Sequence, residues 1–292
     1  MIKPNTGSRS YQMHLIRLEL LRIGLSKKQN KINNVSPFIH SWRTWNKYKS
    51  IWNSVLDFGK LNKMEKITFD IAIDYLKEIK NRGYSKRQIQ TVVSALRKLE
   101  NGWNRVVKKN FKDDTRVKLN LANLDIKKLT ADMKHPKVNR AFNKPWKVIE
   151  NLRLEIHKIT ARLLLEGGLR IREANHIKID QLEKEPCIKV KGKGGLKRTI
   201  WVSDYTYSFI KASVLVDGEF YFNQTNFRRD LEQAIERSGE NGSPHSFRYN
   251  FAQRLYYHVL PKLGYRRKQC LQIVSERLGH HRPDITNKYL AR

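Results

Sequence analysis

The residues His245-Ser246-Phe247-Arg248 stand in the middle of a series of polar motifs in this 292-residue chain. Gly168-Leu169-Arg170-Ile171-Arg172-Glu173 precedes them, and Lys193 lies between two glycines. Leu278-Gly279-His280 follows, and Tyr289 stands nine residues after that histidine. A tyrosine hydroxyl is a poor nucleophile unless its surroundings activate it. The cationic and imidazole groups that accompany this tyrosine therefore indicate phosphoryl chemistry on a polyanion.

The charge of the chain points to the same kind of partner. Fifty-nine Lys and Arg residues face 27 Asp and Glu, which gives a formal net charge of +32. Residues 1–138 carry 30 basic and 11 acidic side chains, and the rest carries 29 and 16, so both halves are basic. Such an imbalance repels itself and is typical of proteins whose charge a polyanion neutralises. We therefore expect both halves to grip double-stranded DNA.

Membrane proteins and metal-dependent enzymes fit the sequence less well. No apolar run approaches the roughly 20 residues that span a bilayer, and no signal peptide opens the chain, so we expect no membrane partner. Cys187 and Cys270 match neither a metal-ligand spacing nor a disulfide framework, which favours the reducing cytoplasm. There we expect the protein to be associated with nucleoid DNA. Neither a Walker loop nor a carboxylate cluster is present, so we expect no metal and no other cofactor.

Length and periodicity predict two domains. Residues 1–36 form a basic segment with one amphipathic helix from residue 13 to 25, where leucines recur at helical spacing at Leu15, Leu18, Leu21 and Leu25. This helix either packs on its own domain or docks on another subunit. Residues 37–110 are predicted to form a helical DNA-binding domain, residues 111–139 a linker region, and residues 140–292 a catalytic domain.

Three helices with apolar faces are predicted in the first domain. The first starts after Ser41, and its apolar face consists of Trp42, Trp45, Tyr48, Trp52, Val55 and Leu56. The second starts after Thr68 and stops near Gly83, and the third starts at Ser85, which can form a capping box with Gln88. The solvated faces carry the cations that we expect to contact DNA phosphates, which are Lys47, Lys49, Lys86, Arg87, Arg97 and Lys98.

The second domain is predicted to combine helices with one β-hairpin. Residues 159–165 are typical of a buried helix that ends at Gly167-Gly168, and residues 171–177 of another helix. Apolar residues alternate on both sides of the glycine-rich turn at residues 192–195, which predicts a hairpin with a flexible tip. Helices resume after Asn226, with breaks at residues 239–244 and 261–264.

In their order and spacing, these motifs resemble the tyrosine recombinase (phage integrase) family. The resemblance runs from about residue 140 to residue 289, and residues 37–110 resemble the SAM-like core-binding domain of that family. It implies a mainly α fold with a small β-hairpin or sheet, in which a helical domain and an α+β catalytic domain form a C-shaped DNA clamp. It also implies a site-specific recombinase that works through a 3′-phosphotyrosyl intermediate, independently of metal and ATP. Integration, excision, inversion or resolution, mainly of a mobile element, are the expected reactions.

The resemblance assigns a catalytic set, which is Arg170, Lys193, His245, Arg248, His280 and the nucleophile Tyr289. Glu173 matches an acidic position that supports the first arginine. Two guanidiniums suit the charge that develops on the non-bridging phosphate oxygens, because arginine stays protonated and donates charge-assisted hydrogen bonds. His245 can take the tyrosine proton as a general base, His280 can add a donor, and Lys193 can protonate the departing 5′ oxygen.

Two of these assignments have close neighbours that could replace them. Arg172 follows Arg170 closely, and Lys193 sits between Lys191 and Lys197, so either role could shift by a few positions. The neighbours therefore stay candidates at this stage.

Two further features depart from the pattern of the family. Tyr249 and Asn250 stand where relatives more often have His-Thr, which should change packing rather than chemistry. Three residues follow Tyr289, too few for the C-terminal segment by which many relatives reach a neighbouring subunit. We therefore expect subunits to communicate through another surface, or to assemble more loosely.

Two other functions stay open beside recombination. A type IB-like topoisomerase would use the same nucleophile and arginines, but it would relax supercoils as a monomer and without a defined site. A catalytically silent DNA-binding relative would keep the fold without the chemistry. For the recombinase we expect a homotetramer on two synapsed DNA sites, which accessory DNA-bending proteins could assist.

Overall fold

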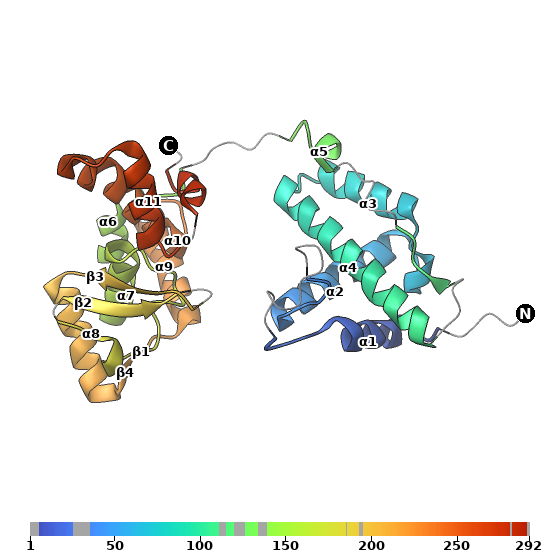
Figure 1. Ribbon diagram of the computed structural model, residues 1–292, viewed down its shortest axis with the longest axis horizontal. Coiled ribbons are helices and arrows are strands. Elements are labelled where there is room, and N and C mark those ends of the chain that lie inside the picture. Colours follow the sequence, from blue (N-terminus) through green and yellow to red (C-terminus); the bar gives the residue numbers. More distant parts are fainter. Residues whose placement is uncertain are drawn as a thin grey trace, which may run out of the picture. The chain divides into compact units, whose positions relative to one another are not determined.

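The computed structural model describes residues 6–25, 36–110, 115–119, 126–133, 139–184, 186–192, 195–280 and 282–290. The chain forms two compact units, Met1–His135 and Pro136–Arg292, each with its own hydrophobic core (Figure 1). Helices dominate both units, and the strands within the described residues are short and lie in the second unit. The predicted fold class, mainly α with a small β-hairpin in the second half, is confirmed.

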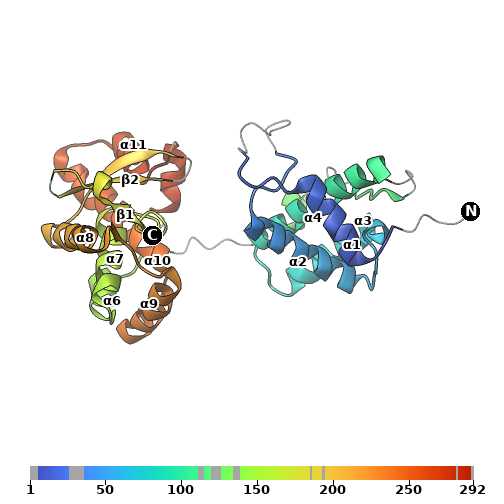
Figure 2. The same ribbon diagram turned by 90° about the horizontal axis from the view of Figure 1, so that it is seen from below.

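The first unit is built from helices, several of which begin at a capping side chain. They are α1 (Arg9–Leu20), α2 (Trp42–Phe58), η1 (Met64–Lys66), α3 (Phe69–Asn81), α4 (Lys86–Asn110) and α5 (Ile126–Leu129). Ser8, Ser41 and Thr68 each accept a hydrogen bond from the backbone N–H three residues on. Before α4, the Ser85 N–H donates to Gln88 Oε1 over 2.7 Å and the Gln88 N–H donates to Ser85 Oγ, as the capping box predicts. Figure 2 shows α1, α2, α3 and α4 packed against one another.

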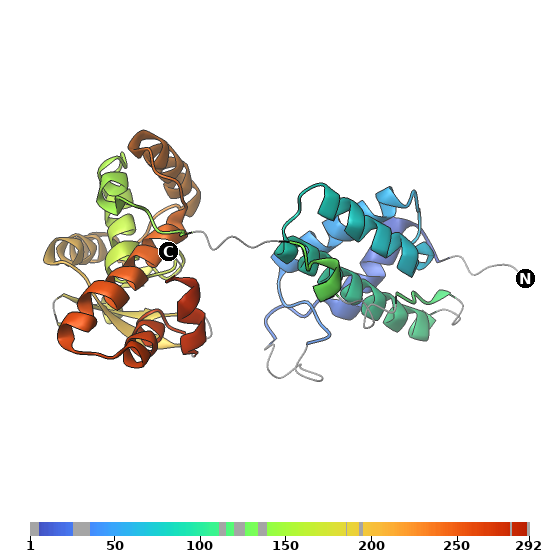
Figure 3. The same ribbon diagram turned by 90° about the horizontal axis from the view of Figure 1, so that it is seen from above.

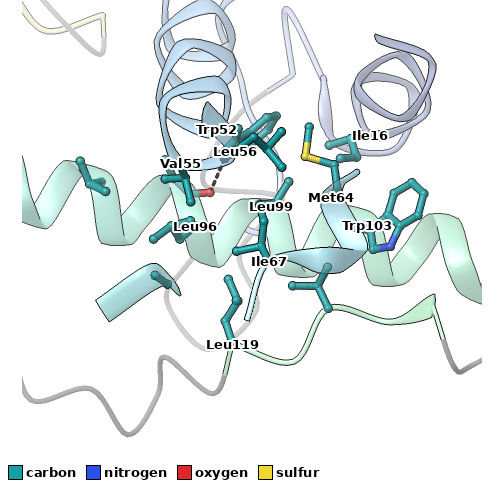
Figure 4. Close-up of a cluster of buried hydrophobic side chains, with 14 of the residues drawn as sticks. Ile16, Trp52, Val55, Leu56, Met64, Ile67, Leu96, Leu99, Trp103 and Leu119 are labelled. Carbon is teal, nitrogen blue, oxygen red and sulfur yellow. Dashed lines mark hydrogen bonds between the residues drawn. The ribbon is translucent and has the colours of Figure 1, made fainter. Parts of the chain in front are cut away.

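Two tryptophans lie at the centre of this unit (Figure 4). Trp52 and Trp103 are fully buried, and each indole N–H is satisfied by a backbone carbonyl at 2.8 Å, that of Ala95 and that of Thr115. α1 belongs to the same core, because Ile16 and Leu20 are also fully buried. The first predicted alternative for this helix, packing on its own domain, is therefore confirmed.

Parts of the predicted apolar faces are wrong. In α1 the buried stripe runs through Gln12, Met13, Ile16 and Leu20, whereas Leu18 is 56% exposed and Leu25 lies beyond the helix. The leucines and the true stripe share a helical period, so spacing alone could not separate the two faces. In α2, Trp42 is 52% exposed because it is the first helical residue and lies one turn before the buried stripe begins at Trp45.

The second unit packs helices around two small antiparallel sheets (Figure 3). Its helices are α6 (Pro145–Glu150), α7 (Glu155–Glu166), η3 (Ile179–Gln181), α8 (Asp204–Asp217), α9 (Gln224–Ser238), α10 (Pro244–Arg254), η4 (Leu255–Val259), η5 (Pro261–Leu263), α11 (Arg267–Arg277) and η6 (Pro283–Lys288). β2 (Cys187–Lys191) pairs with β3 (Lys197–Trp201) as the predicted hairpin, with Ile188 opposite Ile200. β1 (Ile177–Lys178) pairs with β4 (Glu219–Phe220). Within the described residues, no helix has the length and apolarity needed to cross a bilayer.

Two expectations for the second unit are wrong. Residues 171–176 form turns rather than a helix, because Asn175 exchanges hydrogen bonds with the backbone of Phe222 and His176 adopts a left-handed φ of 59°. The sequence pattern also predicts no helix between the hairpin and residue 226, where the structure has α8. Its Leu215 and Val216 are 68% and 82% exposed, and these apolar residues on the solvent side obscure the helical period.

The buried helix α7 sets up the site. Its interior residues Ile159, Leu163 and Leu164 are fully buried, and it ends at Gly167 as predicted. Gly168 then turns the chain with a φ of +60°, and a Cβ there would lie 2.4 Å from the ring of Phe251. Only glycine therefore allows the segment after α7 to run this close to α10.

Candidate active site

The second unit brings together all but one of the predicted catalytic residues. Arg170 follows α7, His245 and Arg248 lie on α10, His280 follows α11, and Tyr289 directly follows η6. Hydrogen bonds, ion pairs and ring contacts join these five side chains, in part through Glu173. The sixth, Lys193, lies outside the described residues.

Helix ends place two of these groups. Ser243 and Ser246 form a capping box at the start of α10, and Pro244 occupies its first turn. His245 is therefore held in the first turn, one turn before Arg248 and on the same side of the helix. At the other end of the site, Gly279 terminates α11 with a φ of +65°, and the chain turns back so that the His280 N–H donates to the Ser275 carbonyl.

Arg248 is the buried cation of the site. Its side chain is inaccessible to solvent, and its guanidinium donates to the carbonyl oxygens of Gly168 and Leu278. Its Nη2 also lies 3.2 Å from Nε2 of His280. Burial lowers the pKa of Arg248 to about 10, which leaves it charged at neutral pH. Arg248 thus ties the segment after α7 to the turn that carries His280.

Glu173 is the acidic centre of an arginine cluster. Its Oε1 accepts a hydrogen bond from Arg170 Nη1 at 2.5 Å, and its Oε2 accepts one from Arg198 Nη2 at 2.7 Å. Arg248 Nη1 lies 3.8 Å from the same Oε2. Burial alone would raise the pKa of Glu173, but the hydrogen bonds and charges of Arg198 and Arg170 outweigh it and lower the pKa to about 2. Glu173 thus contacts Arg170 directly, and its supporting role stays a prediction.

Tyr289 is packed among rings and held next to an imidazole. Its hydroxyl oxygen lies 3.3 Å from Nε2 of His245, and its ring centroid lies 4.7 Å from that of Tyr249 and 5.4 Å from that of His280. The Arg248 guanidinium carbon lies 5.7 Å from the centroid of the Tyr289 ring. The side chain of Gln253 donates to the Tyr289 carbonyl oxygen over 3.0 Å. The tyrosine is therefore held by both its ring and its backbone.

Both histidines of the site have a strongly lowered pKa. Burial, followed by the charges of Arg248 and Arg170, lowers the pKa of His245 to about 4. The same causes, in the same order, lower the pKa of His280 to about 4. Both imidazoles are therefore neutral at pH 7, and His245 has a free electron pair with which to accept the tyrosine proton.

A cavity of about 600 Å³ opens beside Arg170, Glu173 and His245. The charged residues that line it are Arg170, Arg172, Glu173, Lys191 and Arg228, together with His245. Because the only carboxylate of this lining is already engaged by arginines, the cavity suits an anion. Among the described residues, no cluster of three His, Cys, Asp or Glu side chains is placed to hold a metal ion.

The structure distinguishes Arg170 from its neighbour Arg172, but it does not distinguish between the candidate lysines of the hairpin. Arg170 pairs with Glu173, while Arg172 is exposed at the rim of the cavity. Lys191 is exposed at the end of β2 and lines the cavity, and Lys197 is exposed at the start of β3. Arg170 is thus the arginine built into the cluster.

Tyr249 and Asn250, which depart from the pattern of the family, both serve packing. The Tyr249 ring lies against Tyr289 and meets His245 edge-on at 5.5 Å. The Phe142 N–H donates to Asn250 Oδ1 over 3.0 Å, and Asn250 Nδ2 donates back to the Phe142 carbonyl over 2.7 Å. This exchange anchors the start of the second unit on α10.

Arg198 is the residue of the cluster that the sequence analysis missed. It lies on β3 opposite Val190, and it shares the inward face of the strand with the buried Ile200. Strand alternation was the available signal, because an arginine two positions before a core isoleucine falls on the inner face.

The cations predicted to contact DNA phosphates all lie on α2 and α4 of the first unit. Four of them are exposed, and these are Lys47, Lys49, Arg87 and Arg97. Lys86 and Lys98 are partly buried, and the Lys98 ammonium donates to the Ser36 carbonyl. Lys98 therefore also holds the segment that precedes α2.

Two comparisons relate the sequence of this chain to known proteins. A model of the Phage integrase family matches residues 132–292, more than half of the chain. Tyrosine recombinase XerA of Pyrococcus horikoshii is 26% identical over 238 residues, which cover 75% of this chain and 74% of that protein.

Solved structures show the same fold at low sequence identity. A lambda integrase tetramer bound to a Holliday junction has a TM-score of 0.65 at 12% identity, over 98% of this chain and 78% of that chain. XerH site-specific recombinase in a pre-cleavage complex with difH substrate has a TM-score of 0.57 at 18% identity, over 84% and 73%. From the family match, together with the curated relative, we conclude that the chain belongs to the phage integrase family of tyrosine recombinases.

Proposed function

We propose that this protein is a site-specific DNA recombinase that cleaves and rejoins strands through a 3′-phosphotyrosyl bond. The observation that carries the proposal is the placement of the Tyr289 hydroxyl, 3.3 Å from the neutral His245, which itself lines a cavity together with three arginines. A nucleophile, a proton acceptor and a site for the phosphate charge are what attack on a phosphodiester requires.

In the proposed cleavage step, Tyr289 Oη attacks the scissile phosphorus while its proton passes to His245. The bond between phosphorus and the 5′ oxygen breaks, and the 5′ oxygen takes a proton from a lysine of the β2–β3 hairpin, for which Lys193 is our assignment. The tyrosyl ester retains the phosphodiester bond energy, so that a 5′ hydroxyl from another strand can reverse the step and rejoin the DNA. Side chains supply each of these groups, and we therefore expect cleavage in EDTA and without ATP.

The two arginines act on the phosphate in different ways, because Arg170 is partly exposed and Arg248 is fully buried. Arg170 lines the cavity with 27% of its side chain exposed, so it can donate directly to a non-bridging oxygen. Arg248 is fully buried, and its guanidinium donates hydrogen bonds to two carbonyl oxygens. Its charge therefore acts on the phosphate from the protein interior, where water screens it weakly. The negative phosphate would also raise the pKa of His245 from its low value and make this imidazole a stronger base.

We assign DNA gripping to both units and strand exchange to an assembly of four chains. Residues 37–110 would form the core-binding domain and residues 140–292 the catalytic domain. In the region 111–139, predicted to be a linker, Val117, Leu119 and α5 pack with the core of the first unit. Lys47, Lys49, Arg87 and Arg97 are exposed cations on the first unit, where they can reach phosphates. A structurally similar lambda integrase has been solved as a tetramer on a Holliday junction, which supports a homotetramer on two synapsed sites here. The substrate would be the ends of a mobile element, joined, excised, inverted or resolved.

Covalent trapping tests the proposal. The full chain is incubated in EDTA with nicked duplexes that tile the DNA flanking its coding sequence, and adducts that survive denaturation are counted. We expect an adduct with the wild type and none with Tyr289→Phe. No wild-type adduct on any duplex would favour a catalytically silent relative, and an adduct with Tyr289→Phe would exclude this nucleophile. Efficient relaxation of a supercoiled plasmid without any of these sequences would instead indicate a topoisomerase.

A further inference from the structure

Arg198 is a buried arginine that none of the steps above uses. Its side chain is 8% exposed, and its Nη2 is paired with Glu173 Oε2 at 2.7 Å. Its Nε and Nη1 are buried and have no hydrogen-bond partner among the described residues. Burying a guanidinium with two unsatisfied donors is costly, so packing alone is a poor reason for an arginine here.

The surroundings of Arg198 belong to three catalytic segments. A Cβ added at Gly192, at the start of the hairpin turn, would lie 3.0 Å from its Nη1. A Cβ added at Gly279, next to His280, would lie 2.9 Å from the same atom. The guanidinium thus lies close to the backbone of both glycines through Nη1, while its Nη2 contacts Glu173.

The division of the Glu173 carboxylate matters for Arg170. Arg198 and the Arg170 backbone N–H occupy Oε2, so that the Arg170 guanidinium is bound through Nη1 to Oε1. Without Arg198, a second nitrogen of the Arg170 guanidinium could reach Oε2 of Glu173. Arginine would then pair with the carboxylate through two hydrogen bonds, which is the geometry that these groups prefer. Arg170 would then turn donors toward Glu173 that otherwise face the cavity.

We propose that Arg198 is a positioning residue for strand cleavage. By occupying one oxygen of Glu173 it keeps Arg170 directed at the phosphate, and by filling the space between Gly192 and Gly279 it seats the start of the hairpin turn against the turn that carries His280. A lysine could supply the charge but not the planar fork that spans these groups. This inference rests on the proposed function, because it concerns the same cleavage step.

The test compares wild type with Arg198→Met and Arg198→Lys in the full chain. Adduct formation by pre-bound complexes is followed on a nicked duplex with an ordinary scissile phosphate and on one with a methylphosphonate, which lacks the non-bridging negative charge. We expect Arg198→Met to slow cleavage of the phosphate about 10- to 100-fold while the Kd for DNA changes less than about threefold. On the methylphosphonate the difference from wild type should shrink to within about threefold, because Arg170 has no charge to neutralise there. The cleavage rate of Arg198→Lys on the phosphate should fall between those of wild type and Arg198→Met.

Arg237→Met is the matched control, because Arg237 also pairs with a carboxylate, that of Asp230 at 3.9 Å, but lies outside the cluster. It should cleave like wild type. A normal rate for Arg198→Met, or an equal loss on both substrates at an unchanged melting temperature, would overturn the inference. If wild type itself forms no adduct, the proposed function fails; if wild type cleaves and Arg198→Met cleaves equally well, only the role of Arg198 fails.

Discussion

The Nε2 atom of His245 lies 3.3 Å from the hydroxyl oxygen of Tyr289, and the two rings are held at a centroid distance of 5.7 Å. If His245 is the general base, His245→Ala should slow adduct formation by about 10²- to 10⁴-fold, the usual contribution of such a group, with DNA affinity unchanged. Single-turnover trapping on a nicked duplex measures this rate. His258→Ala, which removes an exposed histidine of η4, should cleave normally. Wild-type cleavage by His245→Ala would assign the proton to another acceptor.

The two low histidine pKa values predict acid-sensitive folding. His245 and His280 titrate at about 4 in the native chain and near 6.5 when unfolded, so the unfolded state binds more protons between these values. The free energy of unfolding should therefore fall as the pH is lowered from about 6.5 to 4, a loss complete only below the native pKa values. Urea unfolding at a series of pH values tests this, and the double variant His245→Gln, His280→Gln should flatten the profile. An unchanged profile in that variant would show that other groups cause the loss.

Glu173 should be the most sensitive carboxylate of the second unit. Its side chain is 5% exposed among three arginines, so Glu173→Ala leaves like charges close together without a counter-charge. We expect the free energy of unfolding to drop by about 3–5 kcal/mol, as for other buried pairs that lose one partner. Glu183→Gln, which alters the solvent-exposed pair with Lys189, should have little effect. Equal stability of the two variants in urea would refute the central role of Glu173.

The close contact between α1 and α4 predicts a stability defect in the first unit. A Cβ at Gly102 would lie 2.6 Å from Leu20 Cδ1 and 2.9 Å from Ile16 Cγ2, inside normal contact distance. Gly102→Ala should therefore destabilise this unit by about 1–3 kcal/mol, despite the better helix propensity of alanine. Asn101→Ala, at the exposed neighbouring position, is the control. A Gly102→Ala variant that is more stable than wild type would show that α1 yields without cost.

The exposed lysines of α2 predict a change in the salt dependence of DNA binding. If Lys47 and Lys49 both contact phosphates, replacing both with alanine should reduce the slope of log K against log salt by about 2. Titrations at several salt concentrations measure the slope. Lys77→Ala on α3, where Lys77 pairs with Asp74, should leave the slope as it is. An unchanged slope in the double variant would place the DNA on a different face of the first unit.

The sequence predicted which polar residues lie together better than it predicted the segments around them. Arg170, His245, Arg248, His280 and Tyr289 could be named because their spacing along the chain follows a known family. The turn at 171–176 could not, because hydrogen bonds that Asn175 exchanges with the backbone of Phe222, 47 residues away, override a local pattern that suits a helix. For Arg198, strand alternation indicates the inward face of β3, but the carboxylate that makes its burial tolerable is 25 residues distant. Local periodicity carries no information about such partners.

Tyr289 is anchored by the polypeptide to which it belongs. Gln253 holds its carbonyl oxygen, Tyr257 donates to the carbonyl of the following Leu290, and the rings of Tyr249 and His280 flank its side chain. A chain so arranged carries its nucleophile and its activating groups together. Two defective proteins, one lacking the Tyr289 hydroxyl and the other lacking the Arg170 guanidinium, should therefore fail to complement each other when they are mixed or co-expressed.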